Sequence, residues 1–494
     1  MQKILPNKNP KQGLLGNTNS SLFGSNLFQK GQRSIRKELI EEEKAQFRSV
    51  AVPEPRYCDR LKQEIKKNKM LKMHLTMDNY PIDNLRDGRK LARKMYRVQR
   101  RKNIVKDDYC ARINFASGLG DRDVAKSFSV GVKYFRELEI KLEQNSYYRI
   151  MKNWIRIFQS KRFPKIKTLN LKMASWYILE AFPHGFSRLK SLFQDVENLN
   201  VTFTQMHGKK DLLIQDFTLR FIRRLDKLKN LRIEFTYCQF IKDEHLDVIS
   251  RTLRSRLNSL ESLKLVLDGL NDQVTPKAIE RLWKSVNKIP SLKTLDLIGG
   301  FGQNKINYGA FAELCDVIER KSATLLSLKV DIGYTEIRSP AHQQLCKVLV
   351  PLLPILHRLE LKFVCLESVS DQSLILFGDL LSNGSNSLKT LGLQFGTHHG
   401  LTTRGAKELA NRIKKGCFPM VEKLSIDFQM TYDLTYYGLY DIAEAVSIAF
   451  PNLKDFWFSY SGSHASTDAK ITKKANSMLK DRLKSLPKEF RLYW

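Results

Sequence analysis

Residues 260–267, Leu260-Glu-Ser-Leu-Lys-Leu-Val-Leu267, carry an apolar-x-x-apolar-x-apolar-x-apolar pattern that decides the fold. Its last three apolar positions alternate, as in a strand with one buried face. The pattern begins at residues 135, 166, 196, 228, 260, 292, 325, 356, 388, 421 and 453, and the copy at 292 has Gly299 in its last apolar position. Successive copies start 30 to 33 residues apart, and a degenerate twelfth copy is predicted at 490–494. A spacing held this closely predicts one repeat array rather than three separate domains.

Helix-like segments lie between the predicted strands. Residues 278–286 place Ile279, Leu282, Trp283 and Val286 at spacings of three and four, and residues 311–318 and 406–413 are patterned alike. One strand and one helix per unit, each unit burying its neighbour, predict a curved α/β solenoid.

The L-x-x-L-x-L core over about residues 135–460 resembles the leucine-rich repeat family. The long period is similar to that of the ribonuclease-inhibitor-like subclass, which implies a full helix on the convex side and eleven to twelve repeats. One departure is that the family's usual Asn or Cys, three residues after the third leucine position, is replaced by residues such as Thr204, Thr236 and Asp268. The turns after the strands are therefore expected to be less regular.

The chain divides into four expected regions. Residues 1–60 are an extended basic arm, and residues 61–134 a basic helical lead-in that caps the first repeat. Residues 135–460 are the solenoid, and residues 461–494 a C-terminal cap helix with a closing strand. Residues 1–37 contain seven basic residues and no acidic one, as in a mitochondrial transit peptide. Pro6, Pro10 and Gly13 would interrupt a targeting helix, so a flexible arm is preferred.

Positive charge is concentrated near the start of the chain. The 494 residues have a formal net charge of +33, and residues 1–134 hold 30 basic against 14 acidic residues. Residues 301–450 balance at 15 against 15. The densest segment is compatible with a solvated helix face. A polyanion-binding helix stripe is preferred, because so many like charges gain little without a polyanion. Its basic residues are Arg86, Arg89, Lys90, Arg93, Lys94, Arg97, Arg100, Arg101, Lys102 and Lys106.

The side chains between the apolar strand positions are expected on the concave face. Eight are basic and eight acidic over eleven copies, so the face is predicted to be neutral and to suit a folded protein or peptide rather than phosphates. The candidate partner-binding residues there are Lys264, Lys329, Arg358, Lys362, Lys423 and Trp457.

No catalytic motif stands out. The seven cysteines are widely spaced without a C-x-x-C, so disulfides and a zinc site are not expected, and those at 238, 315, 346 and 365 are expected to be buried. The sequence contains no stretch of 18 apolar residues, so a membrane-spanning helix is not expected. The expectation is a non-enzyme with no metal, cofactor, small-molecule substrate or membrane partner.

Three functions remain open. The first is a structural scaffold in a large cytoplasmic assembly of the cytoskeleton or cilium, whose basic region grips an acidic polymer, with tubulin of a microtubule as the best candidate. The second is an RNA-contacting component of a ribonucleoprotein such as a mitochondrial ribosome. The third is a substrate-recognition adaptor of a ubiquitin ligase, although residues 61–134 lack a visible adaptor-binding box.

Overall fold

The computed structural model describes residues 73–76, 109–115, 137–142, 166–174, 193–204, 218, 221–238, 241–268, 274–300, 306–333, 339–363, 369–395, 400–428, 431, 433–459, 477 and 489–493. The chain forms two compact units, Met1–Leu71 and Lys72–Trp494. Every described residue belongs to the second unit.

A single parallel sheet runs through this unit. Fourteen strands follow one another in chain order without a crossover. They are β1 (Met73–Thr76), β2 (Tyr109–Phe115), β3 (Glu137–Leu142), β4 (Thr168–Ala174), β5 (Asn198–Thr204), β6 (Asn230–Thr236), β7 (Ser262–Asp268), β8 (Thr294–Gly300), β9 (Ser327–Gly333), β10 (Arg358–Lys362), β11 (Thr390–Gln394), β12 (Lys423–Asp427), β13 (Asp455–Ser459) and β14 (Glu489–Tyr493).

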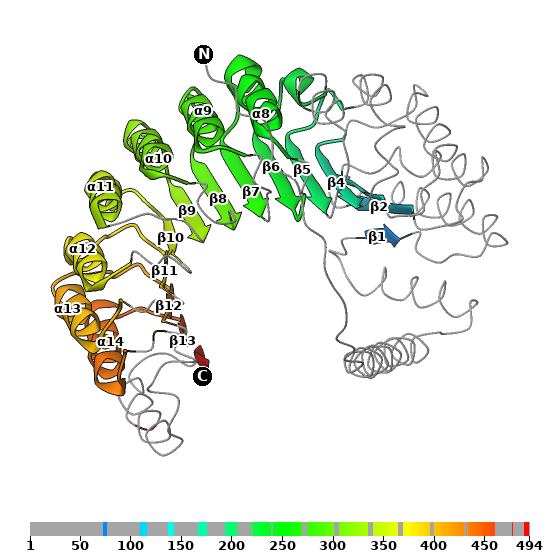
Figure 1. Cartoon of the computed structure of the whole chain (residues 1–494). Helices are drawn as coiled ribbons and strands as arrows, with labels where there is room; N and C mark the ends of the chain where they lie inside the picture. The colour runs from blue at the N-terminus through cyan, green and yellow to red at the C-terminus, as the bar shows by residue number, and fades with distance from the viewer. Residues whose placement is uncertain are drawn as a thin grey trace, which may run out of the picture. The chain divides into compact units, whose positions relative to one another are not determined.

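From β6 to β13, a described helix connects each strand to the next. They are α8 (Asp243–Arg256), α9 (Pro276–Val286), α10 (Tyr308–Arg320), α11 (Ser339–Leu349), α12 (Asp371–Ser382), α13 (Thr403–Ile413) and α14 (Tyr436–Ala449), with short 3-10 turns η5 (Ile222–Arg224) and η6 (Val350–Leu352). From β4 to β13 the strands line the inner side of a curve and the helices its outer side (Figure 1). The α/β leucine-rich repeat solenoid predicted from the sequence is therefore the fold.

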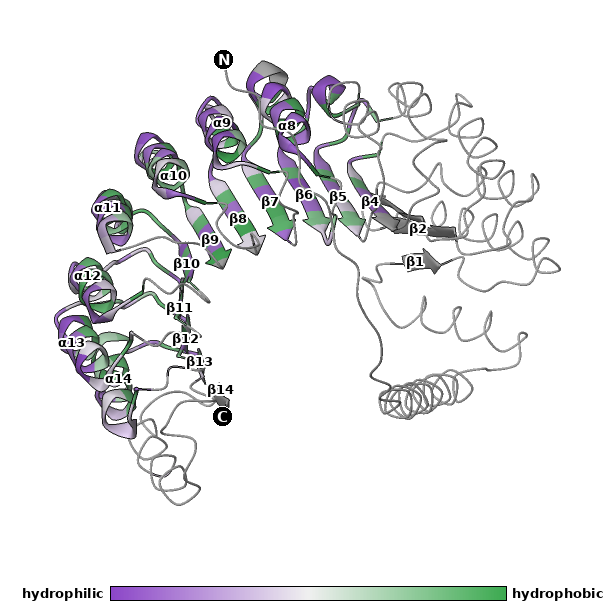
Figure 2. Ribbon diagram, viewed as in Figure 1, coloured by the Kyte–Doolittle hydropathy of each residue, from purple (hydrophilic) through white to green (hydrophobic). Residues whose placement is uncertain are grey.

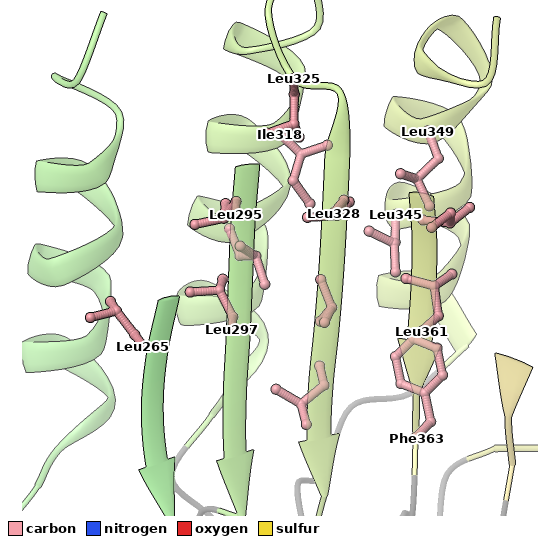
Figure 3. Packing of buried hydrophobic residues seen from close by; sticks show 14 of the residues in the cluster. Leu265, Leu295, Leu297, Ile318, Leu325, Leu328, Leu345, Leu349, Leu361 and Phe363 are labelled. Atoms are coloured by element: carbon pink, nitrogen blue, oxygen red, sulfur yellow. The ribbon is translucent and has the colours of Figure 1, made fainter. Parts of the chain in front are cut away.

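The apolar positions of the repeat form one continuous core. Buried residues of a single cluster run from Ile166 to Phe458. Hydrophobic and hydrophilic residues alternate along the strands, and the helices are hydrophobic toward the strands and hydrophilic on the outward side (Figure 2). Leu295 and Leu328 from the strands and Leu345 from a helix are all buried in the core between strands and helices (Figure 3). Each repeat thus buries its neighbour's apolar surface, as a solenoid requires.

The strand register confirms the repeat pattern. Equivalent leucines pair across neighbouring strands, as in Leu263 with Leu295 and Leu295 with Leu328. β14 pairs with β13 at Phe490 and Leu492, so the degenerate twelfth copy is also confirmed as a strand.

Two strands precede the first recognisable repeat. β1 and β2 pair in register with the rest of the sheet, so the sheet extends into the expected lead-in of residues 61–134. Ala111 lies where the next strand has Leu138, and this small residue hides the motif in the sequence. The extended arm, the helical character of the lead-in and most of the C-terminal cap helix lie outside the described residues.

Local capping follows ordinary side-chain chemistry. The hydroxyl of Thr275 accepts a hydrogen bond from Ala278 N–H, Asn307 accepts one from Ala310 N–H, and Thr402 accepts one from Arg404 N–H. These caps satisfy backbone donors that the first helical turn leaves unpaired.

Candidate functional site

The basic segment 86–106 lies outside the described residues. Its role as a polyanion-binding site therefore stays a prediction from the sequence. The candidate concave residues are all described, and they make up the site that the structure can build.

Charged side chains form a row across the middle of the concave face. Strand pairing aligns one residue from each of β6 to β10, because parallel strands in register keep equivalent positions side by side. The aligned residues are Arg232, Lys264, Asp296, Lys329 and Glu360.

Arg358 joins two repeats that are not neighbours, those of β8 and β10. Its guanidinium donates to Glu360 Oε1 at 2.7 Å on its own strand and to Asp296 Oδ1 at 3.2 Å on β8. Since β9 lies between β8 and β10, this side chain reaches across a whole strand. Lys329 on that middle strand forms an ion pair with Glu360 at 2.8 Å. The four residues make a chain of ion pairs of alternating charge, from Asp296 through Arg358 and Glu360 to Lys329.

Two further ion pairs flank this group. Lys362 lies 3.3 Å from Asp331 Oδ2, and Arg232 donates to Glu234 Oε2 at 2.5 and 3.1 Å. We call these pairs, the group around Arg358, and Lys264 the concave charge network. Its members are Arg232, Glu234, Lys264, Asp296, Lys329, Asp331, Arg358, Glu360 and Lys362.

Partial burial makes these charges depend on one another. The side chain of Asp296 is 10% exposed and that of Arg358 is 32% exposed. Burial acts to raise the pKa of Glu360, but hydrogen bonds from Arg358 and Lys329 outweigh it and lower that pKa. Burial raises the pKa of Asp331 despite the nearby Lys362 ammonium. The network therefore stabilises the ionised form of Glu360, whereas burial disfavours the ionised form of Asp331.

Lys264 differs from the other four cations of the network. It forms no ion pair or hydrogen bond with any other described residue. Burial lowers its pKa, and the neighbouring charge of Arg232 lowers it further. One half-buried lysine is thus left without a carboxylate of its own among the described part of the chain.

An uncharged ladder lies beside the network, on β4 to β6. Asn200 donates to Asn170 Oδ1, Asn230 donates to Asn198 Oδ1, and Asn198 donates to Thr168 Oγ1 at 3.1 Å. The concave face therefore changes from amide groups to charged groups along the array.

The two remaining candidate residues lie apart from the network. Lys423 on β12 is exposed, and Trp457 on β13 is half-buried. Between Glu360 and Trp457 the middle row continues through the small residues Gly392 and Ser425. The structure thus brings Lys264, Lys329, Arg358 and Lys362 together and leaves the other two at the C-terminal end.

Residues just before the strands form a second, more exposed set of charges. Backbone N–H groups there donate to the preceding repeat's carbonyl from residue 197 to residue 454, at 2.7–2.9 Å. Ion pairs join Lys167 and Lys229 to Glu197, Lys293 to Glu261 and Lys454 to Glu422, at 2.7–3.2 Å. We call these residues the strand-start row. Lys and Glu recur directly after the first apolar position of the motif, and this recurrence was a signal in the sequence that could have revealed the row.

No cluster of His, Cys, Asp or Glu suited to a metal occurs among the described residues. The prediction of buried cysteines is confirmed for Cys238, Cys315 and Cys346, and burial raises the pKa of the Cys315 thiol to about 12. Of the helices within the described ranges, none is long and apolar enough to cross a membrane.

Comparison with known proteins gives a fold likeness. No protein-family model matches the chain, and no curated protein matches it. A chain in the crystal structure of the Rad7 and Elc1 complex in yeast is similar over 92% of this chain and 96% of its own length, with 14% identity and a TM-score of 0.45. At this identity and score the similarity identifies neither a family nor a partner. The class defined by the fold itself is a leucine-rich repeat solenoid.

Proposed function

We propose that this protein is a non-enzymatic scaffold or adaptor that holds a partner protein on its concave face. The observation that carries this proposal is the concave charge network, in which ion pairs occupy four of five cations. A nucleic-acid track needs a surplus of cations along the phosphates, whereas a protein surface offers both signs of charge. The mixed network therefore favours a protein partner.

The concave face can be tested by charge reversal. Arg358→Glu places a carboxylate beside Asp296 and Glu360, and it should abolish capture of proteins that bind the full chain. Lys407→Glu on the convex side of α13 is the matched control, because Lys407 is exposed and unpaired among the described residues. Thermal unfolding of both variants separates lost binding from lost folding. Equal binding by the two variants would count against a concave partner site.

The basic segment supports a second part of the proposal. We infer that Arg86 to Lys106 anchors the scaffold on an acidic polymer, with microtubules as the preferred candidate and RNA as the alternative. The support is compositional: ten basic residues among 21. A cytoplasmic location in the cytoskeleton or cilium follows from the first partner, and a mitochondrial location from the second.

The period and the full convex helices favour the ribonuclease-inhibitor-like subclass.

Co-sedimentation distinguishes these anchors. Two full-length variants are compared. Binding to microtubules should be lost when Gln replaces Lys90, Lys94, Lys102 and Lys106. Binding should be kept when Gln replaces the exposed lysines Lys277, Lys288, Lys407 and Lys415. Removal of the acidic tubulin tails should have the same effect as the first set. Binding to single-stranded RNA that falls steeply with salt, without microtubule binding, would replace tubulin by RNA.

A further inference from the structure

An apolar spot lies next to the lysine that has no carboxylate. Val266 follows Lys264 by two residues on β7, so both side chains face the concave side. Val266 pairs in register with Ile298 of β8, and the two side chains are buried and half-buried. One cation and two aliphatic groups therefore share two neighbouring strands.

The carboxylates nearest to Lys264 are engaged elsewhere. Glu234 on β6 accepts from Arg232, and Asp296 on β8 accepts from Arg358. Asp268 faces the same side but lies at the end of β7, roughly 13 Å along the strand. The remaining groups facing Lys264, Arg232 and Lys329, are cations that lower its pKa. An added carboxylate would therefore relieve repulsion and find an available ammonium.

We propose that Lys264, Val266 and Ile298 form a docking site for an extended acidic segment of a partner protein, with a carboxylate and, two residues further, an aliphatic side chain. This inference deepens the proposed scaffold function and rests on it. In an extended peptide, side chains two residues apart point to one side about 7 Å apart, which matches the spacing of Lys264 and Val266 along β7. The carboxylate binds the ammonium, and the aliphatic group packs on the half-buried Ile298 beside Val266.

Charge complementarity favours this occupant over a phosphate chain. Asp296 pairs in register with the lysine on β8, and Glu234 lies diagonally from it on β6, where it pairs with Val266. These two carboxylates would repel a second and third phosphate. A single carboxylate fits between them, because the ion pairs with Arg232 and Arg358 hold both flanking acids. The apolar pair beside the lysine has no use in phosphate binding, whereas it discriminates among peptides.

The test is selection from a library of random displayed peptides by the full chain. The wild type should enrich peptides with Asp or Glu two residues from Leu, Ile or Val. Lys264→Glu should instead enrich Lys or Arg at that place, while Lys407→Glu should keep the acidic preference. Lys264→Ala should weaken a selected acidic peptide by about tenfold, the loss expected for one hydrogen bond to a charged group.

The outcomes separate this inference from the scaffold proposal. An acidic preference that survives Lys264→Glu, with unchanged thermal unfolding, overturns the docking site. If the wild type selects peptides without this pattern and Arg358→Glu abolishes their binding, that outcome supports the scaffold function and rejects Lys264 as the centre of the binding site. Failure of the folded wild type to select any peptide rejects both. Selection of a segment of this same chain would redirect the site to self-association and overturn the partner assignment.

Discussion

The concave charge network and the strand-start row use the same residue types with different consequences. Lys454 and Glu422 in the row have side chains 66% and 47% exposed, whereas Arg358 and Asp296 in the network are 32% and 10% exposed. Water screens the first pair and competes for its hydrogen bonds, so it adds little to stability. The second pair is partly removed from water, so each charge requires its partner. Position within the repeat thus decides what a lysine or glutamate does.

The largest effect is expected at Arg358. Arg358→Met leaves Asp296 nearly buried without its guanidinium and removes one of two donors from Glu360. Removing one partner of a half-buried pair should destabilise the fold by about 2 kcal/mol, less than for a fully buried pair. Urea unfolding followed by circular dichroism measures the loss. Adding Asp296→Asn should restore part of it, and strict additivity of the two changes would contradict the coupling.

The pH dependence should divide the two carboxylates of the network. The lowered pKa of Glu360 contributes stability that is present above 4.5, its ordinary value, and is lost as pH falls through the lower folded-state pKa. The raised pKa of Asp331 acts oppositely, because its ionised form costs stability that protonation restores. Thermal midpoints measured from neutral to acidic pH should fall less steeply for Glu360→Gln and more steeply for Asp331→Asn. Parallel profiles for both variants would refute this division.

A smaller effect is expected in the strand-start row at Glu197. This carboxylate accepts hydrogen bonds from both Lys167 and Lys229, and these bonds lower its pKa. Glu197→Gln should lower the thermal midpoint slightly at low salt, and the difference should vanish at high salt because exposed charges are screened. A difference that persists at high salt would show that packing rather than charge is responsible.

The smallest effect is expected at the other end of the row. Lys454→Met removes the ion pair with Glu422, in which both groups are exposed. No measurable change in the unfolding midpoint is expected, because such pairs are screened and mobile. A loss comparable to that of Arg358→Met would remove the distinction between the two sets of charges.

Repeating apolar positions made most of the fold predictable. Leu263, Leu265 and Leu267 alternate in a spacing that each later repeat copies, and the structure pairs them in register. The strands β1 and β2 were not predicted because this alternation weakens there, with Ala111 in a leucine position. Local periodicity therefore reveals a strand only where large apolar residues fill the alternating positions.

The pairing of charges was less predictable. The equal numbers of acids and bases on the concave face could be counted from the sequence, but the partners could not. Arg358 and Asp296 are 62 residues apart and on strands that are not neighbours, so their contact depends on side-chain length and sheet curvature. Lys264 lacks an ion pair because of that contact: Arg358 donates to Asp296, the carboxylate that pairs in register with Lys264.

The reach of Arg358 over β9 also sets a rule for dividing this protein. In most repeat arrays each unit interacts only with its immediate neighbours, so a cut between any two units costs one interface. Here a boundary between β9 and β10 would also separate Arg358 from Asp296, which lies two units upstream. The nearly buried carboxylate of Asp296 would then lose its ion pair. Fragments intended to fold alone should therefore keep β8, β9 and β10 together.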